Sequence, residues 1–173
     1  MRNDVEEISF KELLGYSIEG EEVAHEAYME ISEKLSGLAS DRFQNLAKDE
    51  LDHKQKLLKL HEHEFGDKEY IIPKGEGFPP HEGDFIKIDT DKLNSLISTL
   101  ESAIEAEKDA YELYYRLAEK IGKHSALFNY IALMEKGHQV SLEEEKEMYE
   151  EILKEKAKRE DITIDELGFS RYE

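Results

Sequence analysis

The feature that most constrains the fold is an internal repeat that carries acidic and histidine side chains. The segment Ser17–Tyr28 aligns without a gap on Ala103–Tyr114, and Ile, three Glu, Ala and Tyr recur in it. A Glu-x-x-His motif that begins at Glu50 then recurs at Glu135. The two offsets, 107 − 21 = 86 and 135 − 50 = 85, differ by one residue of loop length. The chain therefore reads as two copies of one helical hairpin.

Apolar residues with helical periodicity cover four segments. The first is expected to begin at a capping-box pattern, Ser9 with Glu12, and to end at Gly37. The others run from about residue 40 to 66, 90 to 122 and 125 to 159. Residues 67–89 contain all three prolines and predict a long crossover loop, and residues 161–173 lose the period and predict a C-terminal tail. The predicted fold, over residues 1–160, is all-α: a four-helix bundle of two hairpins joined by a crossover, which is a ferritin-like topology.

Composition excludes several classes of protein. A formal charge of −19 argues against nucleic acid or an anionic membrane as partner, because both attract basic surfaces. The chain has no cysteine, which excludes disulfides, iron–sulfur clusters and thiolate zinc sites. The acidic segment before Phe10 has no apolar run, and no stretch approaches the length of a membrane span, so we expect a cytoplasmic protein.

The helical register places the acidic residues of the repeat inside the apolar stripes. Steps of three or four residues along the third predicted helix lead from Leu100 through Ala103 and Glu107 to Ala110. Ionised carboxylates buried in a small bundle are very costly without cations, and no Lys or Arg lies at the same level of these stripes. Two divalent ions and two neutral imidazoles would balance four carboxylates.

The repeat and the register together predict a two-metal centre. Its six predicted ligands all lie on inward helical faces: Glu21, Glu50, His53, Glu107, Glu135 and His138. Mixed carboxylate and imidazole ligands suit Fe or Mn, and Zn less well. The predicted cofactor is two iron ions, with Mn or Zn as alternatives. The opposing interpretation is that these residues are ordinary charges beside the apolar stripes. A similar pair, Glu22-x-x-His25, has Lys108 and Tyr111 as its counterparts in the repeat and is not expected to bind metal.

With this pattern present twice, the chain resembles the rubrerythrin-like branch of the ferritin-like superfamily over about residues 9 to 158. The resemblance implies that Glu50 and Glu135 bridge the two metals, that Glu21 and Glu107 are terminal ligands, and that each motif histidine binds one metal. Classical rubrerythrins have a further Glu where this chain has Ala110. They also carry a cysteine-ligated rubredoxin domain, so here the electrons are expected from a separate redox donor such as a rubredoxin.

Two tyrosines and the choice of reaction complete the expectations. Tyr28 and Tyr114 lie seven residues after a predicted ligand on the same helical face, so each either hydrogen-bonds a ligand carboxylate in support of catalysis or simply fills the core.

Three functions fit the predicted centre. The first is an oxidoreductase that reduces hydrogen peroxide or dioxygen in the defence against oxidative stress. The others are a ferroxidase or iron-handling protein and a non-enzymatic, metal-stabilised interaction module. We expect a homodimer.

Overall fold

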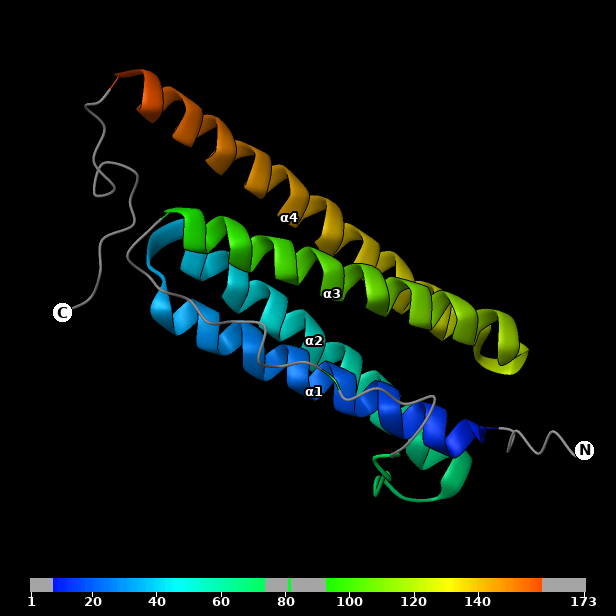
Figure 1. Cartoon of the computed structure of the whole chain (residues 1–173). Coiled ribbons are helices and arrows are strands. Elements are labelled where there is room, and N and C mark those ends of the chain that lie inside the picture. The colour runs from blue at the N-terminus through cyan, green and yellow to red at the C-terminus, as the bar shows by residue number, and fades with distance from the viewer. Residues whose placement is uncertain (1–7, 74–80, 82–92, 160–173) are drawn as a thin grey trace, which may run out of the picture.

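The computed structural model describes residues 8–73, 81 and 93–159, and these form a bundle of four long helices (Figure 1). The helices are α1 (Phe10–Lys34), α2 (Gly37–Phe65), α3 (Leu93–Lys120) and α4 (Ser125–Arg159), and a short 3-10 turn, η1 (Gly122–His124), precedes α4. α1 packs along α2, and α3 packs along α4, as two antiparallel hairpins. The described residues contain no strand. The predicted all-α four-helix bundle is therefore confirmed.

The helix ends agree with the sequence patterns except at the turn between the first two helices, where the second helix begins at Gly37 and not near residue 40. The Ser9 side chain accepts a hydrogen bond from the backbone N–H of Glu12, and the Glu12 side chain accepts one from the backbone of Ser9, so the predicted capping box is present. Gly66 ends α2 in the left-handed conformation with φ of 86°. The prediction that Gly37 ends the first helix is wrong, because α1 ends at Lys34 and Gly37 begins α2. Its φ of 61° provides the sharp turn between the two helices.

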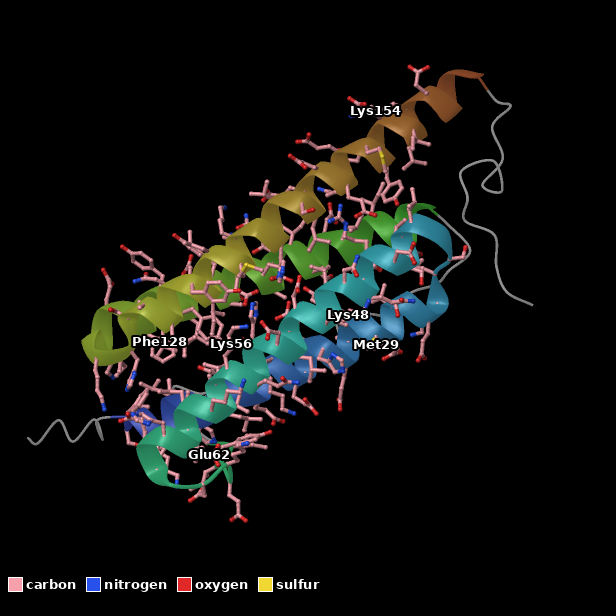
Figure 2. All side chains as sticks on the ribbon, turned by 180° about the vertical axis from the view of Figure 1, so that it is seen from behind. Met29, Lys48, Lys56, Glu62, Phe128 and Lys154 are labelled. Atoms are coloured by element: carbon pink, nitrogen blue, oxygen red, sulfur yellow. The ribbon has the colours of Figure 1, made fainter. Side chains whose placement is uncertain are left out.

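The apolar core consists of two clusters with a polar layer between them. On α1, Leu14 and Ile18 belong to one cluster, while Tyr28 and Ile31 belong to the other. Glu21 lies between these pairs on the same helix and is also buried. The other three helices repeat this order, with buried acidic or histidine residues between two apolar groups. Side chains of all four helices extend into the space between the hairpins (Figure 2), and α4 extends from Phe128, near its start, to Lys154, near its far end.

The chain that follows α2 packs closely against α1. A Cβ atom at Gly15 would lie 2.1 Å from the carbonyl oxygen of Ile71, so only glycine permits this approach of two backbones. Further along α1, a Cβ atom at Gly20 would lie 2.8 Å from the imidazole carbon Cε1 of His81. Residues 67–73 and 81 lie outside the helices, in agreement with a crossover. The rest of the predicted crossover loop and the predicted tail at 161–173 lie outside the described residues.

Candidate metal centre

The structure brings the six predicted ligands together in the polar layer of the bundle. Glu21 comes from α1, Glu107 from α3, and each Glu-x-x-His motif from one turn of α2 or α4. All six side chains are buried, with at most 7% of the residue surface exposed. Because the i, i+3 spacing places both motif residues on one helical face, each motif directs its Glu and His to the centre together.

The six side chains form two overlapping groups of four. Glu21 and His53 belong to one group, and Glu107 and His138 belong to the other. Glu50 and Glu135 belong to both groups. Within each group, one potential ligand atom per residue lies within 4.8 Å of the others. Two groups that share two carboxylates are the arrangement that two adjacent cations require.

The two histidines occupy equivalent positions in the two halves of the centre. The Nδ1 atom of His53 lies 2.9 Å from Glu135 Oε1, 3.4 Å from Glu50 Oε2 and 3.5 Å from Glu21 Oε2. The Nδ1 atom of His138 lies 3.2 Å from Glu50 Oε1, 3.3 Å from Glu107 Oε2 and 3.4 Å from Glu135 Oε2. The ring centroids are 5.9 Å apart. Each imidazole therefore presents Nδ1 to both shared carboxyls and to one terminal carboxyl.

Several polar atoms of this centre have no hydrogen-bond partner although they are fully buried. They are Oε1 of Glu50, both carboxyl oxygens of Glu135, Nδ1 of His53 and both ring nitrogens of His138. Among the described residues, no Lys or Arg forms an ion pair with the four carboxyls. Buried polar atoms without partners are costly, and bound cations are the partners that this oxygen-rich and nitrogen-rich set would accept. The donor set thus fits a pair of divalent metal ions.

In the metal-free protein, protons bound to the carboxyl and imidazole groups balance the negative charge that metal ions would otherwise balance. Burial raises the pKa of Glu21 well above its usual range, and burial also raises the pKa of Glu135. Burial by itself would lower the pKa of His53, but contacts with Glu135, Glu21 and Glu50 raise it to about 12. The pKa of His138 is raised in the same way by Glu107, Glu135 and Glu50, against the effect of burial. Metal ions must displace these protons in order to bind.

Tyr28 and Tyr114 connect the two hairpins through the centre. The hydroxyl of Tyr28 on α1 donates a hydrogen bond to Glu107 on α3, and the hydroxyl of Tyr114 on α3 donates one to Glu21 on α1. Burial raises the pKa of both phenols well above the usual value, so both hydroxyls keep the proton that they donate. Both rings also belong to the apolar clusters. The two expectations for these tyrosines, a hydrogen bond to a carboxyl and a place in the core, are therefore compatible.

One side chain outside the predicted set contacts the outer side of a predicted ligand. The Oδ2 atom of Asp49, a half-exposed residue, lies 3.4 Å from Nε2 of His138, which is the ring nitrogen opposite the one that faces the carboxyls. A carboxylate on the outer nitrogen commonly orients a histidine ligand and makes it more basic. The repeat could not reveal this residue, because the counterpart of Asp49 at an offset of 85 is Met134.

The remaining histidines lie away from the six ligands. His25 donates from Nδ1 to the backbone oxygen of Ala47, so the Glu22-x-x-His25 pair does not join the centre. His61 donates from Nδ1 to the backbone oxygen of Asp67 at the end of α2. In the described part of the chain, no other group of His, Asp and Glu has metal-binding geometry. None of the described helices is long and apolar enough to cross a lipid bilayer.

A pocket of about 860 Å³ opens between α1 and α3 and reaches the centre. Four of the six ligands line it: Glu21, Glu50, Glu107 and Glu135. The ring of His81 also lines it, stacked on Tyr16 at 4.0 Å between centroids, with Nε2 donating to the backbone oxygen of Tyr16. Sequence analysis gave His81 no role, because only the folded chain brings this isolated loop residue next to Gly20.

Fold and site together define a ferritin-like bundle with a buried carboxylate and histidine metal centre. The model of the family described as Rubrerythrin matches residues 12–146, which include all six residues of the centre, so the chain belongs to the rubrerythrin family. A solved structure of a hypothetical protein from Pyrococcus furiosus has 31% sequence identity and a TM-score of 0.74, over 84% of this chain and 93% of that one. A search of the curated proteins gives no match.

Proposed function

We propose that the protein is a di-iron oxidoreductase that reduces hydrogen peroxide or dioxygen with electrons from a separate donor such as a rubredoxin. The observation that carries this proposal is the sharing of Glu50 and Glu135 by two four-residue groups in a buried layer without a basic counter-charge. Iron is favoured over manganese and zinc by the family and by ligands that are mostly oxygen atoms. Two iron(II) ions at this position supply the two electrons that cleavage of an O–O bond needs.

The residues of the chain have distinct tasks in this function. Glu21 with His53, and Glu107 with His138, would hold one metal each, and Glu50 and Glu135 would hold both. The phenols Tyr28 and Tyr114 fix the two terminal carboxyls across the hairpins, so that the donor set keeps its shape when the metal changes oxidation state.

Metal analysis after anaerobic reconstitution with Fe(II) tests the metal centre directly. We expect two iron ions per chain, and we expect Glu50→Ala and Glu135→Ala to lose them because each carboxyl belongs to both groups. Glu22→Ala is the matched control, because Glu22 pairs with Lys54 outside the centre. Less than one bound transition metal per chain in the unaltered protein would contradict the proposal.

Rapid mixing of the iron(II)-loaded protein with oxidants tests the reaction. We expect oxidation by hydrogen peroxide to be faster than oxidation by dioxygen if the protein is a peroxidase, and the reverse order if it is a ferroxidase. Oxidation by neither would leave only the third function, a metal-stabilised interaction module. Reduction of the oxidised centre by reduced rubredoxin then tests the proposed donor.

One observation favours iron handling as a second candidate. The exposed acidic residues Glu101, Glu105, Asp109 and Glu112 of α3 line the same pocket that reaches the centre. Such a charged entrance raises the local concentration of cations, including Fe(II). Iron storage requires a closed shell of many subunits, so native mass distinguishes the two functions. We propose a homodimer, and a native mass of two chains would disfavour storage.

A further inference from the structure

The pocket between α1 and α3 is far larger than hydrogen peroxide requires. A water molecule takes up about 30 Å³ of liquid, and hydrogen peroxide has only one more heavy atom. The pocket measures about 860 Å³, which lies within the range of about 300–1,000 Å³ found for sites of small organic ligands. The volume is therefore sufficient for an occupant with a carbon skeleton.

Small residues at equivalent positions of the repeat line this pocket. At an offset of 86 residues, Gly20 corresponds to Ala106 and Ala24 corresponds to Ala110, and all four residues line the pocket. Ala106 belongs to neither apolar cluster of the core, so packing of the bundle does not explain its small size.

The floor and the walls of the pocket differ in chemistry. At the floor, Glu50 and Glu135 present buried carboxyl oxygens without hydrogen-bond partners, and these residues are 2% and 1% exposed. The walls add the apolar side chains of Val23 and Leu113 to the alanines. Four exposed acidic residues of α3 and one cation, Arg116, also line the pocket, so its net negative charge disfavours anions. This combination fits a neutral apolar molecule with one polar end directed at the metal centre.

We propose that the pocket binds neutral organic hydroperoxides, ROOH, and that they are substrates of the centre. The inference rests on the proposed peroxide reduction and names its substrate class. In the reaction the O–O bond breaks, two Fe(II) ions give one electron each and become Fe(III), and two protons from solvent are taken up. The products are the alcohol ROH and water. The alcohol keeps the carbon skeleton, so it is also a ligand of the pocket.

Binding of an unreactive alcohol tests the pocket without any redox chemistry. The probe is 2-phenyl-2-propanol, the alcohol formed from cumene hydroperoxide, added to the zinc-loaded protein and followed by NMR titration. We expect saturable binding that weakens about tenfold or more in Ala106→Phe, since the ring fills the pocket. Ala126→Phe places the same ring on an exposed part of α4 outside the pocket and should bind as the unaltered protein does.

Ala106→Leu is a second variant with the same expected direction, for the case that Ala106→Phe does not fold by circular dichroism. No binding to the unaltered protein, or equal binding to a folded Ala106 variant and to Ala126→Phe, would overturn the inference.

Mixing the iron(II)-loaded protein with two oxidants separates this inference from the proposed function. We expect cumene hydroperoxide to oxidise the centre, and we expect the ratio of its rate to the rate with hydrogen peroxide to fall about tenfold in Ala106→Phe but not in Ala126→Phe. If hydrogen peroxide oxidises the centre and cumene hydroperoxide does not, the proposed function stands and the substrate class is wrong. If neither peroxide oxidises the iron, the proposed function itself fails.

Discussion

Removal of either tyrosine hydroxyl at the centre should destabilise the protein by a similar amount. Tyr28→Phe and Tyr114→Phe each delete one hydrogen bond to a buried carboxyl of the opposite hairpin, Glu107 or Glu21. Each change keeps the ring, which packs in an apolar cluster and is 1% exposed in both residues. The perturbation is therefore confined to one donor.

The size of the effect follows from the burial of the carboxyl that remains. Glu107 is 3% exposed and Glu21 is 4% exposed, so each carboxyl has little contact with water that could replace the lost phenol. A buried acceptor left without its partner costs about 1–3 kcal/mol. For a protein of this size each kcal/mol lowers the melting temperature by about 2–4 °C, so we expect a decrease of about 2–12 °C for each variant.

Urea and thermal unfolding of the metal-free protein measure this prediction. The matched control is Tyr130→Phe, because Tyr130 is 44% exposed and belongs to neither apolar cluster. We expect the control to change the free energy of unfolding by less than about 0.5 kcal/mol. If Tyr28→Phe and Tyr114→Phe cost no more than Tyr130→Phe, the hydrogen bonds between the hairpins do not stabilise the centre and the reasoning is refuted.

Three further predictions concern the metal and the backbone. Asp49→Asn should weaken zinc binding about 10- to 100-fold in a chelator competition, since it removes the carboxylate that faces His138, and unchanged affinity would argue against an orienting role. Contacts with carboxyls raise the pKa of His53 to about 12, so protonation of His53 stabilises the metal-free protein fully below the unfolded-state pKa of about 6.5, and this stabilisation is lost as the pH rises through about 12. Because metal must displace that proton, the increase in melting temperature on zinc binding should grow from about pH 6 to about pH 8, and a constant increase would contradict this linkage. Gly15→Ala should destabilise the protein by about 1–3 kcal/mol, because the new Cβ would lie 2.1 Å from a backbone oxygen. Gly137→Ala should stabilise the protein by about 0.5–1 kcal/mol, because a Cβ there has no atom within 4 Å. Equal melting temperatures of the two variants would contradict both predictions.

The sequence alone determined the helical fold and the composition of the centre. Helical periodicity is a local property of the chain, and a Glu inside an apolar stripe is visible without a structure. The repeat also distinguished the Glu50 pair from the similar Glu22 pair, because only the Glu50 pair recurs as Glu-x-x-His in the second half of the chain. The wrong helix boundaries at the turn around Gly37 arose because a glycine with positive φ can end one helix or begin the next.

Only the tertiary structure decided which side chains meet across the hairpins. The spacing placed Tyr28 on the same face as Glu21, but its hydroxyl reaches Glu107, which lies 79 residues away in the sequence. The contact between Asp49 and His138, and the position of His81 on Gly20, likewise depend on how separate segments pack. The pocket has the same origin, because its volume depends on the distance between α1 and α3, and no local pattern in the sequence encodes the distance between two packed helices.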